Sequence, residues 1–195
     1  MSLIDVPAGQ LAAVVTYLEM RADPGLTVPP SPLKLHRIHP SPSDYRALFR
    51  AVGSSWLWFS RLIMRDSALR AIIDHPAVEL FEVRDGDSAV GMLELDRRIA
   101  GECELSFVAL IPALAGQGHG RWLLAEAVAL AWNADTQRIH VHTCSLDHPA
   151  ALAAYRRAGF VAVGRKLETF IDPRLADILP RDSAPQIPLV ERAGS

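Results

Sequence analysis

Short apolar segments alternate with polar turns along the chain, and their spacing predicts a succession of strands and helices. Residues 11–20 form the first such segment, whose β-branched and aromatic centre is typical of a strand. Four prolines then interrupt regular structure before a weaker alternation over residues 33–38, which predicts a second strand. Residues 1–32 are therefore expected to hold an extra strand and a proline-rich connector. We expect that strand to join the main sheet at an edge, or else to pair across a dimer interface.

Two helices are predicted between residues 41 and 76. Ser41 and Pro42 form a favourable helix start, because a serine side chain caps free amides and proline fits the first helical position. Apolar residues then recur at helical spacing as far as Gly53, and a second, shorter helix is marked over residues 69–73.

From residue 78 onward, strands predominate. Two strand-like runs, 78–84 and 88–96, flank the hairpin signal Asp85-Gly86-Asp87. The elements predicted after them are a strand at 102–110, a glycine-rich turn, a helix at 119–132, a strand at 138–143, a helix at 149–158 and a strand at 160–170. Residues 172–195 contain four prolines and predict an irregular C-terminal tail. This order predicts an α/β (α+β) fold in which helices flank a mixed, mostly antiparallel sheet.

Composition narrows the class of protein. A chain of 195 residues fits one domain, and 50% hydrophobic with 22% charged residues is ordinary globular composition. Twenty basic against 22 acidic residues give a formal charge of -2, which argues against a nucleic-acid partner. Neither the two cysteines nor His140 and His142 have the spacing of a disulfide framework or a metal site. Without a secretory signal or an apolar run long enough to span a bilayer, we expect a cytoplasmic protein with no membrane partner.

The glycine-rich turn at residues 116–121 is the clearest chemical signal. It reads Gly-Gln-Gly-His-Gly-Arg and lies between a predicted strand and a predicted helix. Glycines let the backbone approach a ligand, and a helix N-terminus presents free amides and a positive dipole end. The turn therefore predicts a phosphate or pyrophosphate site. It lacks the Lys-Ser/Thr of a P-loop, and Arg121 stands where the dinucleotide fingerprint has its third glycine.

The chain from Glu104 through Phe160 resembles the GNAT superfamily of acyl-CoA-dependent N-acetyltransferases. Residues 115–120 correspond to that family's Gln/Arg-x-x-Gly-x-Gly/Ala loop. Residues 148–160 read His-Pro-Ala-Ala-Leu-Ala-Ala-Tyr-Arg-Arg-Ala-Gly-Phe, against the family's Asn-x-x-Ala-x-x-x-Tyr-x-x-x-Gly-Phe. There are two departures, because Ala115 replaces the first Gln or Arg and His148 replaces the Asn. The resemblance implies a GNAT-like sheet and a single acyl-CoA N-acyltransferase domain over residues 1–195.

The resemblance also implies how acetyl-CoA binds, with no metal ion involved. Backbone amides of the turn would hold the pyrophosphate, and the pantetheine arm would pair with the preceding strand as an added strand does. The amide of Leu110 would polarise the thioester carbonyl. The implied cofactor-binding residues are Val108, Ala109, Leu110, Ala115, Gly116, Gln117, Gly118, His119, Gly120, Arg121 and His148.

Two residues are candidates for proton transfer. Glu104 lies where many members of the superfamily have an acidic residue, and it would accept the proton of the amine. By strict alternation, the residues that share its strand face are Glu102, Ser106, Val108 and Leu110. Glu94 and Glu102 are the next candidates for the base. Tyr155 occupies the family's general-acid position for the leaving thiolate, whereas helical spacing alone would pack it on Leu152.

The amine acceptor is not specified by these patterns beyond a small molecule or peptide. Trp56, Trp58 and Phe59 join the two early helices, in a segment that often shapes the acceptor pocket in this superfamily. Core packing is the alternative for these aromatic residues, and His140 and His142 have the same two options. The expected activity is direct acetyl transfer from acetyl-CoA to a primary amine in a ternary complex, by a monomer or a homodimer. The alternatives are a non-catalytic acyl-CoA-sensing domain and a nucleotide-binding regulatory domain.

Overall fold

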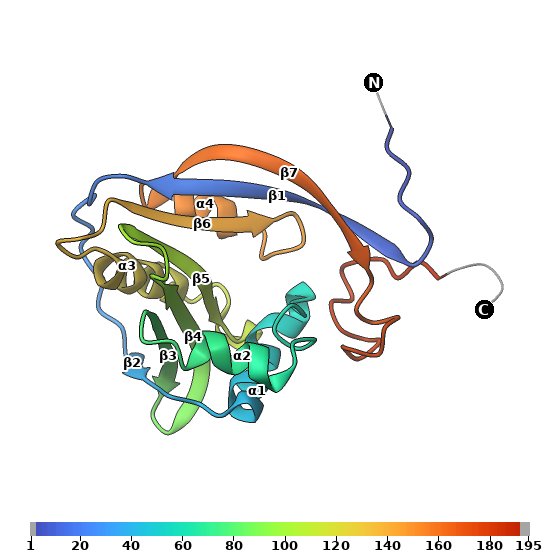
Figure 1. Cartoon of the computed structure of the whole chain (residues 1–195), viewed down its shortest axis with the longest axis horizontal. Helices are drawn as coiled ribbons and strands as arrows, with labels where there is room; N and C mark the ends of the chain where they lie inside the picture. The colour runs from blue at the N-terminus through green and yellow to red at the C-terminus, as the bar shows by residue number, and fades with distance from the viewer. Residues whose placement is uncertain (1–2, 192–195) are drawn as a thin grey trace.

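A seven-stranded mixed sheet runs through the centre of the protein, whose computed structural model describes residues 3–191 (Figure 1). The strand order is β2-β3-β4-β5-β6-β1-β7, and neighbours are antiparallel except β5 and β6, which are parallel. In chain order the elements are β1 (Gln10–Met20), β2 (Lys34–Arg37), α1 (Pro42–Gly53), α2 (Asp66–Ile73), β3 (Val78–Asp85), β4 (Ser88–Asp96), β5 (Glu102–Leu110), α3 (His119–Ala131), β6 (Arg138–Cys144), α4 (Ala151–Arg157) and β7 (Val161–Ile171). The predicted fold class, with its extra N-terminal strand, is confirmed.

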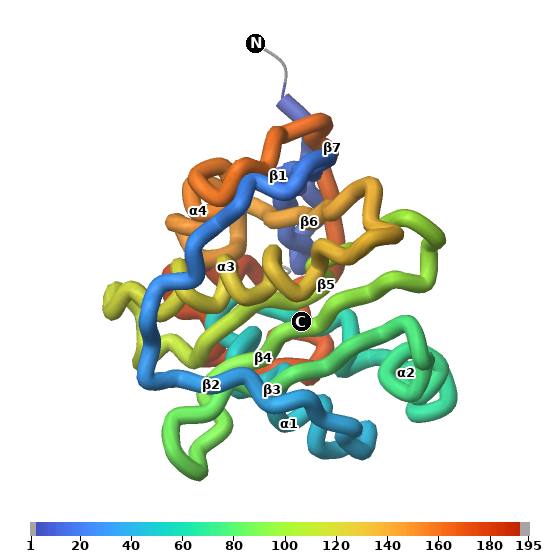
Figure 2. The backbone as a smooth tube through the Cα atoms, turned by 90° about the vertical axis from the view of Figure 1, so that its left-hand side faces the viewer, coloured from blue at the N-terminus to red at the C-terminus, as the bar shows by residue number. Residues whose placement is uncertain are grey.

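The helices cover the two faces of the sheet separately (Figures 1 and 2). Phe49 of α1 and Leu69 of α2 pack with Met92 of β4 in one cluster of buried side chains. On the opposite face, Leu123 of α3 packs with Leu93 of β4, in a cluster that extends to α4. We call the side of the sheet with the first cluster the α1/α2 face and the side with the second cluster the α3/α4 face. Because side chains alternate along a strand, each residue of β4 is assigned to one face by its position.

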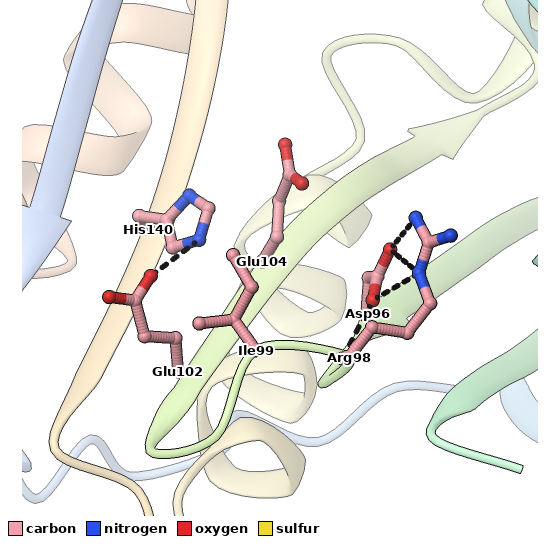
Figure 3. A pocket seen from close by; sticks show the side chains of 6 residues that line it. All are labelled: Asp96, Arg98, Ile99, Glu102, Glu104 and His140. Carbon is pink, nitrogen blue, oxygen red and sulfur yellow. Dashed lines mark hydrogen bonds and ion pairs between the residues drawn. The ribbon is translucent and has the colours of Figure 1, made fainter.

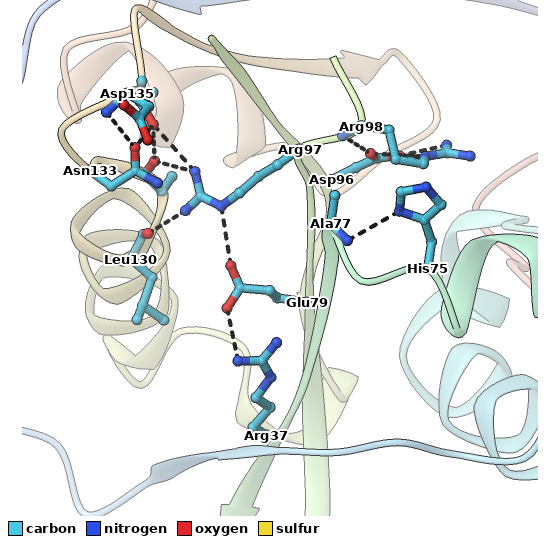
Figure 4. Close-up of polar contacts among 12 residues, drawn as sticks. Arg37, His75, Ala77, Glu79, Asp96, Arg97, Arg98, Leu130, Asn133 and Asp135 are labelled. Carbon is cyan, nitrogen blue, oxygen red and sulfur yellow. Dashed lines mark hydrogen bonds and ion pairs between the residues drawn. The ribbon is translucent and has the colours of Figure 1, made fainter. Parts of the chain in front are cut away.

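Polar contacts fix where the helices begin and end. Ser41 caps α1 as predicted, since its Oγ accepts the amide of Asp44 at 3.3 Å. At the far end of α3, the guanidinium of Arg97 donates to the carbonyl oxygens of Leu130 at 2.6 Å and Ala131 at 2.9 Å (Figure 4). Glu79 holds the same guanidinium from β3 at 3.1 Å. A cation satisfies the free carbonyls of a helix C-terminus, so Arg97 anchors α3 to the sheet.

The N-terminal strand does not lie at an edge. β1 pairs with β6 from Val15 to Met20 and with β7 from Gln10 to Glu19, so both of its edges are occupied within the chain. The prediction of an edge strand, and the alternative of a dimer interface along it, are therefore wrong. The physical reason is that β1 is apolar on both faces. Leu18 packs with the α3/α4 cluster, while Ala13, on the opposite face, is equally buried.

A bulge in β5 changes which residues share a face. Leu105 pairs with Leu95 but Phe107 pairs with Glu94, so Ser106 is an extra residue between them. Glu104 therefore shares the α1/α2 face with Glu102, Phe107 and Ala109. The side chains of Val108 and Leu110 belong to the opposite cluster. The predicted face of Glu104, Ser106, Val108 and Leu110 is wrong, because alternation breaks at the bulge.

The two parallel strands in the middle of the sheet separate soon after they meet. Pairing between β5 and β6 is limited to residues 102–104 and 138–140, and its last pair is Glu104 with His140. Beyond that pair the strands diverge (Figure 1). Within residues 3–191, the β6-facing edge of β5 therefore has no strand partner from residue 105 to residue 110.

The C-terminal segment is irregular yet packed. Residues 172–191 contain no helix or strand, while residues 192–195 of the predicted tail, and residues 1–2, lie outside the described residues. Arg174 is buried, with its guanidinium on the carboxylate of Asp172 at 2.7 Å and on the carbonyl of Ile187 at 2.9 Å. Leu179 packs against Leu57, which joins the segment to the α1–α2 connection. In the part of the chain that is described, no helix is long and apolar enough to cross a membrane.

Candidate active site

The glycine-rich turn leads directly into α3 and offers free amides. Gly116 and Gly118 have φ of +77° and +85°, a left-handed conformation that favours glycine. A Cβ at Gly116, Gly118 or Gly120 would meet no atom within 4 Å, so space lies in front of this backbone. Gly118 is the N-cap of α3 and no side chain caps the helix there. The amides of His119 and Gly120 are consequently available to an anion, whereas the amide of Arg121 donates to the carbonyl of Gly118 at 3.1 Å.

The open edge of β5 runs into this turn. The amide of Ile111 donates to the carbonyl of Val90 at 2.9 Å, on the β4 side. Amides alternate sides along a strand, so the amides of Val108 and Leu110 face the opposite side, toward the diverging β6. An extended amide-bearing molecule could pair with this edge as an added strand.

Glu104 lies where the two strands part, and its carboxylate contacts His142 of β6. Oε1 of Glu104 is 3.5 Å from Nδ1 of His142, and both side chains are partly exposed. The polar contact with His142 holds the pKa of Glu104 below its ordinary value, against the opposing effect of burial. The same contact raises the pKa of His142. Burial lowers the pKa of the neighbouring His140. Glu104 is therefore an ionised carboxylate at neutral pH.

A small cavity adjoins Glu104 at the closed end of the gap between β5 and β6. Its volume is about 200 Å³, and its lining residues are Asp96, Arg98, Ile99, Glu102, Glu104 and His140 (Figure 3). Asp96 is held by Arg98 at 2.6 Å, and Glu102 by Arg138 at 2.9 Å and His140 at 3.5 Å. Because Glu102 is engaged by two basic groups, Glu104 is the carboxylate of this cavity with the weakest cationic partner.

Tyr155 lies on α4, on the other face of the sheet. Its ring packs edge-on against Phe160 at a centroid distance of 5.8 Å. Burial raises the pKa of its phenol, and the negative charge of Asp147 raises it further. Among residues 3–191, none hydrogen-bonds the Tyr155 hydroxyl, which is left free to contact a ligand. His148, at the start of α4, accepts the amide of Ala150 at 3.1 Å through Nδ1.

The aromatic residues between α1 and α2 pack on rings from three other parts of the chain. Trp58 packs on Phe107 of β5 at 5.2 Å, and its indole Nε1 donates to Asp147, beyond the end of β6, at 2.9 Å. Trp58 thus bridges the two strands where they are unpaired. Trp56 packs on His148 at 5.1 Å, and Phe59 packs on Phe170 of β7 at 5.2 Å. Of the three, Trp58 is therefore the residue whose contacts place it at the gap.

Sequence reasoning missed Asp147 and the buried contacts that engage Glu94. Asp147 accepts from Trp58, from the Thr143 hydroxyl at 2.8 Å and from the Cys144 amide at 2.8 Å, and so fixes the end of β6. Glu94, a candidate base from the sequence, is fully buried and accepts from Tyr45 at 2.5 Å and Arg61 at 2.6 Å. The positive charge of Arg61 thus compensates the negative charge of the Glu94 carboxylate. No local pattern would have found either group, since their partners are distant in sequence.

A metal ion has no ready site. In residues 3–191, no group of three or more His, Cys, Asp or Glu side chains could hold one. Cys103 is buried, and burial raises its pKa to about 11. Cys144 is half-buried, and burial likewise raises its pKa to about 11, so neither thiol is a reactive thiolate at neutral pH.

Comparison with known proteins assigns the chain to a family. The sequence profile of the Acetyltransferase (GNAT) family matches residues 45–160, more than half of the chain. The protein therefore belongs to the GNAT acetyltransferase family, and the matched range includes the glycine-rich turn, Glu104 and Tyr155. A search of curated proteins gives no significant sequence match.

Solved structures share the fold at low sequence identity. A GCN5-related N-acetyltransferase from Sphaerobacter thermophilus superposes with a TM-score of 0.60 at 19% identity, over 82% of this chain and 51% of that one. One from Kribbella flavida gives 0.55 at 18%, over 87% and 63%. An IAA acetyltransferase from Bacillus cereus gives 0.52 at 20%, over 68% and 79%. The chain thus spans about half to two thirds of the length of the first two relatives.

Proposed function

We propose that this protein is an N-acetyltransferase that moves the acetyl group of acetyl-CoA directly to a primary amine in a ternary complex. The main support for this proposal is that an open strand edge leads directly to an uncapped helix N-terminus. The open edge of β5, with the amides of Val108 and Leu110, runs into the uncapped N-terminus of α3 at Gly118. An amide-bearing arm that ends in a pyrophosphate, as coenzyme A has, matches an open strand edge followed by an anion site.

The donor would bind through backbone groups. Amides from Gly116 to Gly120 would hold the pyrophosphate. Arg121, whose amide donates to Gly118, would add the positive charge of its exposed side chain. Val108, Ala109 and Leu110 would pair with the pantetheine arm. Ala115 and His148 depart from the family's motifs, but the departures leave these backbone donors in place. We therefore expect acetyl-CoA to bind despite the two substitutions.

Transfer requires a neutral amine, and Glu104 is the proposed proton acceptor. The amine nitrogen attacks the thioester carbonyl carbon, whose oxygen is stabilised by the Leu110 amide. The proton of the attacking nitrogen passes to the Glu104 carboxylate, directly or through one water. Glu104 suits this role because it is ionised at neutral pH and lies on the α1/α2 face, on which Trp58 also packs.

When the tetrahedral intermediate collapses, the carbon–sulfur bond breaks and the thiolate needs a proton. Tyr155 is the proposed donor. Its raised pKa keeps the phenol protonated, and its hydroxyl has no partner among the described side chains. It lies on the α3/α4 face, opposite Glu104, so that the acid and the base approach the reacting atoms from the two sides of the sheet.

Trp56, Trp58 and Phe59 would contact the acceptor. Trp58 packs on Phe107, which shares the α1/α2 face of β5 with Glu104, and Trp56 and Phe59 lie next to Trp58 in the chain. A flat apolar wall beside a carboxylate suits an amine on a small apolar or peptide scaffold.

A steady-state assay of thiol release from acetyl-CoA with a panel of amines tests the proposal. We expect release that depends on the amine, together with saturable binding of acetyl-CoA in a calorimetric titration. Binding without amine-dependent release would instead support the non-catalytic sensing domain. Failure of acetyl-CoA to bind, with binding of ATP, would support a nucleotide-binding regulatory domain and overturn the proposal.

A further inference from the structure

The outermost strand, β7, is an open edge that is exposed along its length. It is the last strand of the sheet and pairs only with β1, so its second row of amides and carbonyls has no partner within residues 3–191 (Figure 1). Apart from Phe170, every residue of β7 is exposed, including Val163, Leu167 and Ile171 at 52%, 47% and 61%. Such an edge invites pairing with another strand unless prolines, bulges or charges block it.

Little along β7 blocks pairing. The strand contains no proline, and its only register shift lies at Val163, next to the start of the strand. The regular stretch from Gly164 to Ile171 spans about 26 Å at the usual rise of a strand. Leu167 lies near the middle of that stretch. A second strand could therefore pair with β7 over nearly its whole length.

The charges on β7 are arranged so that the strand complements itself. Lys166 and Glu168 pair with Val15 and Ala13 of β1, so they lie on the same face of the sheet, one residue on either side of Leu167. In an antiparallel pair, residues directly opposite each other share a face, so a symmetric pair of β7 strands must be centred on one residue. If that residue is Leu167, each Lys166 lies opposite Glu168 of the second copy, twice. If the centre is instead Lys166 or Glu168, two like charges face each other, which is destabilising.

The apolar residues agree with the same register. Centring on Leu167 places the two Leu167 side chains opposite each other, on the face away from Lys166. These side chains are exposed in the single chain and would be covered by the pairing. The charges therefore disfavour a centre at Lys166 or Glu168, and the centre at Leu167 is the one that pairs Lys166 with Glu168.

We propose that two copies of this chain form a dimer by antiparallel pairing of their β7 strands, with the two-fold axis at Leu167. The dimer joins two seven-stranded sheets into one continuous sheet and removes the open edge of each. This proposal concerns the assembly and does not depend on the activity proposed above, since β7 contributes none of the catalytic or acetyl-CoA-binding residues.

Charge reversal tests the register. Lys166→Glu and Glu168→Lys each place two like charges opposite one another at both symmetric positions, and each should weaken the dimer about tenfold. The double variant Lys166→Glu/Glu168→Lys restores both pairs and should return the dissociation constant to near the wild-type value. Arg165→Glu is the matched control, because it reverses a charge that would face Thr169, and it should leave the dimer nearly unchanged. Sedimentation velocity gives the readout, against a chain mass of 21.3 kDa.

A cysteine at the symmetry axis tests the same claim independently. Two Leu167→Cys chains would meet at the axis within disulfide distance, so mild oxidation should link them. Thr169→Cys, which would face Arg165, should link far less. The wild-type chain, with Cys103 buried and Cys144 half-buried, gives the background. A wild-type protein that stays monomeric throughout the micromolar range overturns the proposal. So does a dimer that resists the charge reversals without restoration by the double variant, or one that cross-links equally at both positions.

Discussion

Tyr155 has two properties that a proton donor needs before reaction. It retains its proton at neutral pH, and its hydroxyl makes no hydrogen bond to any group of residues 3–191. Burial and the charge of Asp147 raise its pKa, while its ring is held by Phe160. Packing and chemistry thus use different parts of one side chain. A substitution that removes only the hydroxyl separates them.

Tyr155→Phe should keep the ring contact with Phe160 and lose the proton donor. We expect turnover to fall by about 10²–10⁴, the usual contribution of a general acid, while the affinity for acetyl-CoA hardly changes. Single-turnover acetyl transfer, under conditions where chemistry limits the rate, measures the effect. Wild-type turnover in the Phe variant would show that Tyr155 serves only the core.

The contact between Glu104 and His142 should make stability depend on pH in a definite direction. The lowered pKa of Glu104 contributes stability that is present above its ordinary value of 4.5 and is lost as pH falls through the folded value. The raised pKa of His142 contributes stability that is present below its ordinary value of 6.5 and is lost as pH rises through the folded value. Both contributions are therefore present between pH 4.5 and 6.5. The groups around His142 also include Tyr17, His140, Asp147, Lys166 and Glu168.

His142→Gln should therefore lower the melting temperature most in that window. The two side chains are partly exposed, so the pair contributes at most about 1 kcal/mol and the shift is a few degrees. Thermal melts of the two proteins from pH 4 to 9 measure the difference. A gap between wild type and variant that widens as pH rises past 7 would contradict the assigned direction.

At the scale of elements, the proposed donor site lies at the junction of β5, the glycine-rich turn and α3. Gly118 and Gly25 both have positive φ, of +85° and +62°, and a Cβ at either would meet open space. An alanine at either position costs a similar amount of backbone strain, about 1–2 kcal/mol. Only Gly118 lies at the N-terminus of α3.

Gly118→Ala should weaken acetyl-CoA binding at least about tenfold, because its methyl group would occupy the space in front of the amides. Gly25→Ala is the matched control, and it should lose similar stability while keeping the wild-type affinity. Calorimetric titration of both variants gives the answer. Equal affinities in the two variants would remove the anion site from this turn.

β1 holds β7 to the rest of the sheet, a role that its sequence did not reveal. Because it lies between β6 and β7, deleting residues 1–22 should detach β7 and remove the packing of Leu18 and Met20. We expect the deleted chain to be unfolded or molten, with strong binding of a hydrophobic dye and no cooperative melt. A cooperative melt within a few degrees of the wild-type temperature would contradict this position of β1.

The sequence predicted every strand and α-helix of the described chain because each has a local signal. Ser41 marks the start of α1, and the period of apolar residues marks the rest. The place of β1 between β6 and β7 could not be predicted, since it depends on pairing with strands more than 100 residues away. The bulge at Ser106 was equally hidden, because it is defined by the register with β4 and not by a local pattern.

The residues of the candidate site likewise fall into those that a local motif predicts and those that depend on distant partners. The glycine-rich turn and Tyr155 lie in short motifs and could be read from the chain. Asp147 and the buried pair of Glu94 with Arg61 could not, since they join residues 89 and 33 positions apart. These contacts depend on the fold, which brings the α1–α2 connection across the unpaired ends of β5 and β6.

At the scale of the whole molecule, the sheet separates the α1/α2 face from the α3/α4 face, and the gap between β5 and β6 connects the two. The turn at Gly116 and the side chain of Tyr155 lie on the α3/α4 side, while Glu104 and Trp58 lie on the α1/α2 side. Donor and acceptor can therefore enter from opposite sides and meet between β5 and β6, as direct transfer in a ternary complex requires.

Amide chemical-shift mapping by NMR, with acetyl-CoA titrated into the ¹⁵N-labelled full chain, tests whether acetyl-CoA binds along β5 and the glycine-rich turn. We expect the largest shifts on Val108, Leu110 and the amides from Gly116 to Arg121, with Gly25 unmoved. Large shifts confined to other parts of the chain, with the β5 edge and the turn unchanged, would contradict it.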